Sequence, residues 1–232
     1  MDTFKDMNTL GMIGGTSWHA TEAYYRLINE GVSKKIGSWN SPPLIIHSIN
    51  IALMRAQDKE KIKAHYLDVA HKLEDAGAKA IVICANTPHM VYDYVQPQIG
   101  IPFLHIAEAT GKEAKRLNLK KLGLLGNKPT MTGSFIGGYI EDHFDIEVIR
   151  PEGDALDHSH NFVSKELTQG NFTNEAKDFY LEEISRLKSR GAHGIILGCT
   201  ELPILLKDES AELPMLATTN LHAQMAIDFI LG

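Results

Sequence analysis

The sequence predicts an α/β fold of two related domains, each a small doubly wound parallel sheet with helices on both faces. Two observations support this prediction. Segments of the first half recur in the second half at a nearly constant offset, and short continuous apolar runs alternate with amphipathic helical patterns. With 232 residues, of which 44% are hydrophobic, the chain is long enough to bury the core that such a fold needs.

Three pairs of segments carry the internal duplication. In each pair the second copy follows the first by about 112 to 114 positions. One such match could arise by chance between apolar strands, whereas three in the same order indicate homologous halves. The pairs are residues 9–15 with 121–127, 77–83 with 191–197, and 101–104 with 213–216.

The elements follow from the apolar pattern in chain order. The repeated runs are continuously apolar, which is typical of parallel strands buried on both faces. Between them, runs such as 66–74 and 179–187 place their apolar residues on one helical face. Because no linker rich in Pro, Gly or Ser separates the halves, we predict two closely packed domains, with a ligand site in the cleft between them beyond the carboxyl ends of the strands. We expect residues 1–100 plus 211–232 in the first domain and 101–210 in the second.

Composition argues against several classes of function. A net charge of -6 without a basic stripe predicts no nucleic-acid partner. No apolar run is long enough to span a bilayer, and the first nine residues lack the apolar stretch of a signal peptide, so we expect a cytoplasmic protein without membrane contact. Two cysteines and dispersed histidines predict neither a disulfide framework nor a metal site.

When the two copies of the second repeated pair, 77–83 and 191–197, are aligned and the alignment is continued, Cys199 stands opposite Ala85. Two thiols at these strand ends would flank one tetrahedral carbon, one removing a proton and the other returning a proton to the opposite face, which is the chemistry of racemisation. The site must also supply hydrogen-bond donors to the developing enediolate. Small polar side chains at the strand-to-helix junctions suit that task. They are Thr16, Ser17, Asn86, Thr87, Asn127, Thr130 and Thr200.

The same junctions resemble the signatures of the aspartate/glutamate racemase family from end to end of the chain. The matching runs are 10–18, 24–29, 86–89, 125–126 with 129–131, and 198–203. The resemblance implies two pseudo-twofold-related α/β domains that exchange the strands near Pro102 and Pro214. It also implies a small amino-acid or dicarboxylate substrate, no cofactor and a homodimer. Cys199 carries over as one acid/base, and the polar residues at the junctions carry over as substrate contacts.

The chain departs from the family pattern at its first catalytic position, where Ala85 stands in place of the usual cysteine or threonine. A methyl group cannot transfer a proton, so we expect weak or altered activity. Cys84 is one residue early and should face away from the site as a small buried hydrophobe, although a bulge could turn it inward. The second base is then Thr87, a water or a shifted Cys84. For Cys199, the following helix N-terminus predicts a lowered pKa.

Two alternatives to a racemase remain. One cysteine suffices to protonate an enediolate, as in a decarboxylase of a malonate-type acid. A catalytically degenerate homologue would keep the ligand site without turnover. For His89 and His222, a structural hydrogen bond and a role beside the site are equally compatible with the sequence.

Overall fold

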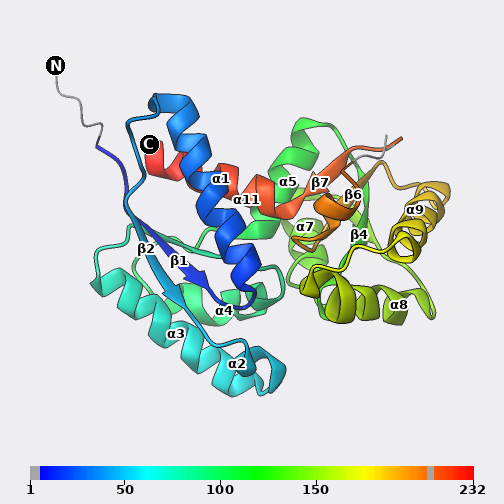
Figure 1. Ribbon diagram of the computed structural model, residues 1–232, viewed down its shortest axis with the longest axis horizontal. Coiled ribbons are helices and arrows are strands. Elements are labelled where there is room, and N and C mark those ends of the chain that lie inside the picture. Colours follow the sequence, from blue (N-terminus) through cyan, green and yellow to red (C-terminus); the bar gives the residue numbers. More distant parts are fainter. Residues whose placement is uncertain (1–5, 208–211) are drawn as a thin grey trace. The chain divides into compact units, whose positions relative to one another are not determined.

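The computed structural model describes residues 6–207 and 212–232, which form two compact units (Figure 1). The described residues up to His105, together with His222–Gly232, make up the first unit. The second unit comprises the described residues of Ile106–Leu221. The predicted boundary between residues 210 and 211 lies within a segment, 208–211, that is outside the described residues.

The first unit contains a parallel sheet of three strands in the order β2-β1-β3. Phe103 adds an isolated parallel bridge to Ile81 beside β3. The strands are β1 (Leu10–Gly14), β2 (Leu44–Ser48) and β3 (Ala80–Ile83), and the helices are α1 (Trp18–Ile36), α2 (Ala52–Arg55), α3 (Lys59–Asp75), the 3-10 helix η1 (Thr87–Val91), α4 (Tyr92–Val95) and the 3-10 helix η2 (Gln96–Gln98).

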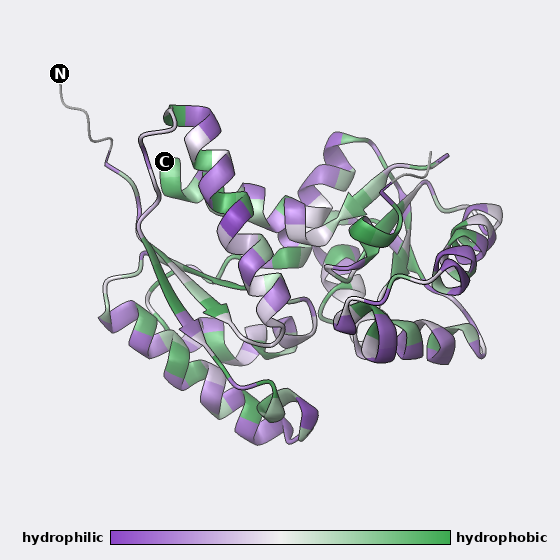
Figure 2. Cartoon of the chain, viewed as in Figure 1, coloured by the Kyte–Doolittle hydropathy of each residue, from purple (hydrophilic) through white to green (hydrophobic). Residues whose placement is uncertain are grey.

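Both faces of this sheet are covered because β1 and β3 are apolar at every position. Ile81 and Ile83 pack with Tyr66 of α3 on one face. Met12 and Val82 pack on the other face with α1 and with the end of α11 (Thr218–Leu231). Successive strand residues therefore enter opposite cores, as the two-residue period of a strand requires. In Figure 2 the strands are coloured as hydrophobic, while α1 and α3 carry hydrophilic residues as well.

The second unit repeats this arrangement with four parallel strands in the order β5-β4-β6-β7. Helix α9 covers one face, and α5 and α7 cover the other. The strands are β4 (Lys121–Leu125), β5 (Glu147–Ile149), β6 (Gly194–Leu197) and β7 (Met215–Ala217), and the helices are α5 (Ile106–Arg116), α6 (Lys128–Thr132), α7 (Gly137–Phe144), α8 (Ala155–Asn161), the π-helical turn η3 (Phe162–Glu166), the 3-10 helix η4 (Leu167–Gln169), α9 (Asn174–Ser189) and α10 (Leu202–Leu205).

The strand register confirms the internal duplication. In the first unit Leu10 pairs with Ala80, and in the second Leu122 pairs with Gly194, so the same repeat positions face each other in both sheets. The bridge of Phe103 to Ile81 likewise corresponds to the pairing of β7 with β6. Doubly wound parallel α/β units are therefore the architecture of both halves, as predicted.

The expected exchange of strands near Pro102 and Pro214 is wrong. Phe103 bridges to β3 of its own unit, and β7 pairs with β6 of its own unit. The helices that follow these strands are what change units: α5 follows Phe103 and packs in the second unit, while α11 follows β7 and ends in the first. An edge strand gains backbone hydrogen bonds by remaining on its sheet, whereas an amphipathic helix needs only an apolar face to cover.

Candidate active site

The candidate residues of the first unit follow β1 and β3, whose carboxyl ends lie at the same edge of the parallel sheet. Gly15 makes the turn out of β1 with a φ of 89°. A Cβ at Gly15 would stand 2.0 Å from the backbone oxygen of Ile49, so the turn requires glycine. The turn presents Thr16 and Ser17 directly after the strand.

Both polar side chains after β1 have partners within the first unit. The Thr16 hydroxyl lies 2.9 Å from the Tyr66 hydroxyl, which comes from α3. Ser17 is the N-cap of α1, and its Oγ accepts a hydrogen bond from the Ala20 backbone N–H at 3.3 Å. Ser17 therefore stabilises the start of a helix in the free protein, a role that a strand-to-helix junction favours independently of any ligand.

Cys84 and Ala85 enter opposite cores of the first unit. Cys84 is 1% exposed and packs in the cluster formed with α1 and α11. Its backbone N–H donates to the oxygen of Ile13 at 2.9 Å, which continues the parallel ladder without a bulge. Burial raises the pKa of the Cys84 thiol. Cys84 is thus a buried thiol facing the helices, whereas Ala85 is half-buried on the opposite side of the strand.

Asn86 and His89 carry buried polar atoms without partners among the described residues. The Nδ1–H of His89 donates to the backbone oxygen of Ala85 at 2.9 Å, which leaves Nε2 as an acceptor. Neither His89 Nε2 nor Asn86 Oδ1 has a hydrogen-bond partner within residues 6–207 and 212–232. Thr87 begins the 3-10 helix η1 and is half-buried.

His222 has a structural role in the first unit. Its Nε2–H donates to the Leu104 backbone oxygen at 2.9 Å, and its Nδ1 accepts from the Tyr24 hydroxyl at 2.8 Å. The His222 ring centroid lies 5.4 Å from that of His89, whose ring centroid is 4.8 Å from that of His105. Burial lowers the pKa of His222 to about 4 and holds the pKa of His89 well below 6.5.

Acid is therefore expected to destabilise the protein. The unfolded chain takes up protons at His89 and His222 near pH 6.5, whereas the folded chain resists protonation, so the free energy of unfolding falls as the pH drops from about 6.5 towards about 4. His222 alone should contribute a loss of about 3 kcal/mol. Urea unfolding across this range checks the expectation. His222→Gln should make the free energy of unfolding depend less on pH, whereas His193→Gln, on the exposed surface, should leave that dependence unchanged. The same pH dependence in wild type and His222→Gln would contradict the expectation.

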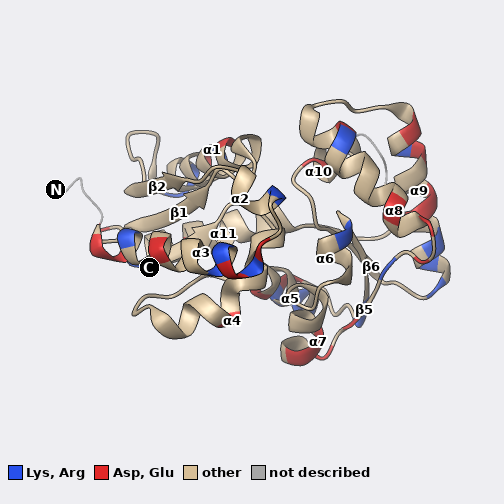
Figure 3. Ribbon diagram, turned by 90° about the horizontal axis from the view of Figure 1, so that it is seen from below, with Lys and Arg blue, Asp and Glu red and all other residues tan. Residues whose placement is uncertain are grey.

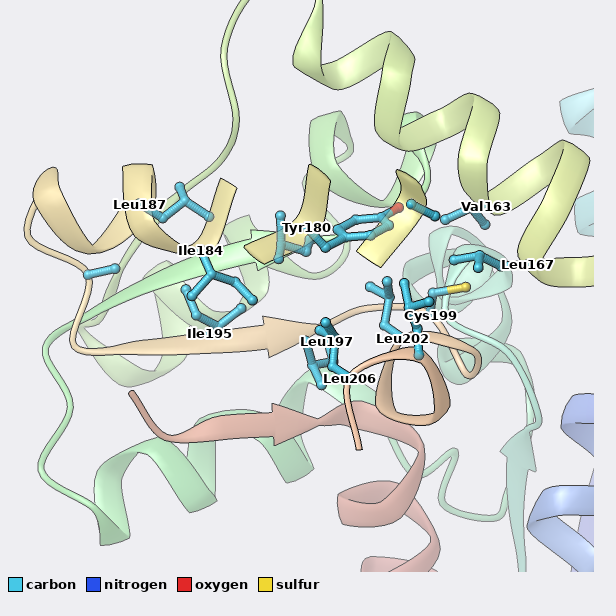
Figure 4. Close-up of a cluster of buried hydrophobic side chains, with 14 residues drawn as sticks. Val163, Leu167, Tyr180, Ile184, Leu187, Ile195, Leu197, Cys199, Leu202 and Leu206 are labelled. Atoms are coloured by element: carbon cyan, nitrogen blue, oxygen red, sulfur yellow. The ribbon is translucent and has the colours of Figure 1, made fainter. Parts of the chain in front are cut away.

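Cys199 follows β6 in the second unit and is 9% exposed. Figure 4 shows its side chain beside Leu167 and Leu202, which belong to the same buried cluster. The thiol donates a hydrogen bond to the Oε2 atom of Glu201 at 2.8 Å. Glu201 is 7% exposed. The sequence alone did not single out Glu201, although its place two residues after Cys199 was the signal that could have revealed it.

The expected lowering of the Cys199 pKa is wrong. Burial raises this pKa well above its ordinary value, and the Glu201 carboxylate raises it further. Backbone hydrogen bonds from Glu201 and Thr200 act in the opposite direction but are weaker. Helix α10, from Leu202 to Leu205, has a single turn, so its dipole is small compared with the cost of burying a thiolate.

The remaining candidates of the second unit lie after β4 and β6. Asn127 is the N-cap of α6, and its Oδ1 accepts from the Thr130 backbone N–H at 2.9 Å. Thr130 is fully buried, and Thr200 is half-buried. Tyr180 of α9 packs in the same buried cluster as Cys199, with its hydroxyl 3.0 Å from that of Ser159.

Charge and metal-binding groups are distributed without a local concentration in the described part of the chain. Lysine and arginine are interleaved with acidic residues (Figure 3), and pairs such as Lys35 with Asp228 and Lys128 with Asp157 tie neighbouring elements together. Residues 6–207 and 212–232 contain no group of three or more His, Cys, Asp or Glu side chains placed to hold a metal ion. No helix in these ranges has the length and apolar character needed to cross a membrane.

Known proteins share this fold. A crystal structure of a candidate Asp/Glu racemase from Yersinia pestis superposes with a TM-score of 0.91 at 36% identity, covering 97% of this chain and 100% of that chain. An aspartate racemase homologue from Pyrococcus horikoshii OT3 gives a TM-score of 0.86 at 32% identity, with coverage of 97% and 100%. The broad specificity amino-acid racemase RacX of Bacillus subtilis is 26% identical over 96% of this chain and 98% of its own length. The sequence profile of the Asp/Glu/Hydantoin racemase family matches residues 13–226, and this chain belongs to that family.

Proposed function

We propose that this protein is an amino-acid racemase that works without a cofactor and uses Cys199 as one of its acid/base groups. The observation that carries the proposal is the buried Cys199 thiol at the end of β6, hydrogen-bonded to Glu201, in a member of a racemase family. A thiol in this place can return a proton to the α-carbon of an amino acid, and the corresponding thiolate can remove one.

The other face of the α-carbon has a weaker partner. The equivalent of Cys199 in the repeat is Ala85, and Cys84 is buried towards α1 and α11. These positions leave the Thr87 hydroxyl or a water to exchange the second proton. We therefore infer a slow racemase, because losing one matched acid/base typically costs about a hundredfold to ten-thousandfold in rate.

We propose that small polar groups at the strand ends bind the substrate carboxylate and stabilise the enediolate. The two buried atoms without partners in the described part of the chain, Asn86 Oδ1 and His89 Nε2, support this assignment for the first unit. Oδ1 is an acceptor suited to an ammonium group of the substrate. The proposed substrate contacts are Thr16, Ser17, Asn86, Thr87, Asn127, Thr130 and Thr200.

The substrate we propose is a small amino acid or a dicarboxylate, in keeping with the names of the similar proteins. The two cysteines of the chain are both free, which supports a reducing, cytoplasmic setting. Trp18 is 65% exposed and Tyr25 is 50% exposed on α1, and exposed aromatics of this kind support a homodimer.

A panel of single enantiomers tests the function. We expect slow loss of optical activity, followed by circular dichroism, with aspartate, glutamate or an uncharged amino acid and without added metal or cofactor. Carbon dioxide release from a disubstituted malonate, with no racemisation, would replace the proposal by the decarboxylase, which the protonated Cys199 thiol also fits. Thermal stabilisation by an amino acid without any turnover would identify a binding protein.

A further inference from the structure

The Cys199 thiol and the Glu201 carboxylate form an isolated buried pair. The Sγ and Oε2 atoms are 2.8 Å apart, and both side chains are at most 9% exposed. Within the described residues, Glu201 makes no ion pair with a lysine or arginine, and the side chain that hydrogen-bonds to its carboxylate is the Cys199 thiol. A buried carboxylate without a cation is costly, and such a group is retained where its charge or its proton has a use.

The groups around the sulfur suit an exchange of one proton within this pair. Backbone hydrogen bonds from Thr200 and Glu201 favour a negative charge on the sulfur, while the Glu201 carboxylate opposes it. Tyr180, from α9, also interacts with the thiol, and burial raises the pKa of Tyr180, so its hydroxyl stays neutral. A thiolate at Cys199 is thus accommodated once the carboxylate has become a carboxylic acid.

We propose that Glu201 is the proton partner of Cys199, so that the pair holds one proton and one negative charge and serves as a single acid/base unit of the racemase. This inference rests on the proposed function. Glu201 is a positioning and proton-holding residue that acts through Cys199.

The Sγ–H proton moves to Oε2, which leaves a thiolate and a neutral Glu201 carboxyl. The thiolate removes the α-proton, the S–H bond forms again, and the electron pair of the C–H bond enters the enediolate of the substrate. A proton then reaches the opposite face of the carbon from Thr87 or water. The Glu201 carboxyl releases its proton to solvent, and Thr87 or the water takes a proton back from solvent, so that both sides of the site return to their starting state. In the reverse direction Cys199 donates the proton.

The repeat shows that the pair is confined to the second half of the chain. Subtracting the offset of the repeat, about 114 positions, places Thr87 opposite Glu201 and Ala85 opposite Cys199. Neither the thiol nor the carboxylate has a counterpart of the same chemistry. The two-residue proton carrier is therefore a feature of the second unit alone.

Alkylation of Cys199 tests the proposal separately from turnover. Iodoacetamide reacts with the thiolate, and mass spectrometry of the Cys199 peptide reports the rate. In Glu201→Gln the repelling charge is gone while the shape is kept, so alkylation at neutral pH should be faster by about tenfold. Racemisation should fall by about tenfold to a hundredfold, because the carboxylate that accepts the thiol proton is missing. Glu183→Gln removes another buried carboxylate, paired with Arg186 at 2.6 Å, and should change neither rate.

Faster alkylation of Cys199 together with slower racemisation in Glu201→Gln supports the proposal. Unchanged alkylation in a folded Glu201→Gln protein would overturn it, as would faster alkylation with undiminished racemisation. Glu201→Asp keeps a carboxylate but places it farther from the sulfur, so this variant should alkylate faster and racemise more slowly than wild type. If Glu201→Gln does not fold, failure of either result in Glu201→Asp overturns the proposal. If the wild type racemises nothing, the proposed function fails, while alkylation still reports whether Glu201 controls the thiol.

Discussion

Replacing Cys199 by alanine is expected to remove racemisation almost completely, lowering kcat by about a hundredfold to ten-thousandfold. The side chain carries the thiol that we place at the α-carbon, and Cys84, the other cysteine of the chain, is buried among apolar side chains of α1 and α11. Initial rates on the best substrate of the panel measure the effect. KM should change little, because the thiol acts on the proton rather than on the substrate's charged groups.

Cys84→Ala is the matched control for this prediction. It removes a thiol of the same size from the equivalent sheet of the other half, and it should reduce stability slightly through lost packing while leaving kcat within about twofold. A Cys199→Ala enzyme that keeps wild-type kcat would exclude Cys199 as an acid/base. A Cys84→Ala enzyme that is folded and inactive would point instead to the earlier cysteine.

Introducing a thiol at Ala85 is expected to raise racemisation by about a hundredfold. Ala85 is half-buried and stands at the repeat position of Cys199, and the strand alternation that buries Cys84 on one side directs Ala85 to the other. A sulfur there would supply the second acid/base that the chain lacks. The rate of Ala85→Cys in both directions of racemisation, at matched substrate concentration, measures the gain.

Ala85→Ser separates proton transfer from a simple change of size. Serine adds a similar volume, but its hydroxyl is a far weaker acid than a thiol, so its gain should be less than about tenfold. An Ala85→Cys protein that is folded and no faster than wild type would show that this position does not reach the reacting carbon. Equal gains for cysteine and serine would attribute the effect to packing.

Much of the fold could be predicted because the duplication and the strand period are local properties of the chain. The offset between repeats predicts matching positions in the two halves, and the sheets show such a match in the pairing of Leu10 with Ala80 and of Leu122 with Gly194. The period of two residues separates Cys84 from Ala85 before any coordinate is known. The sequence could not show that the helices α5 and α11, rather than the strands before them, pass from one unit to the other. The apolar face of a helix does not reveal which sheet the helix covers.

The site was harder to predict because several physical effects compete at one junction. A small polar residue after a strand can cap a helix, contact a ligand or do both, and Ser17 and Asn127 act as caps in the structure. At Cys199, burial and the Glu201 carboxylate outweigh a one-turn helix. These effects depend on surroundings that the local sequence does not specify.

Isotope exchange at the α-carbon, followed together with inversion in deuterium oxide, is the most direct test that Cys199 is the working acid/base of a one-thiol site. The wild type should incorporate solvent deuterium faster than it inverts the substrate, because the thiol exchanges its proton on one face while the other face has no matched partner. Cys199→Ala should do neither. A Cys199→Ala protein that exchanges deuterium at the wild-type rate would contradict the account.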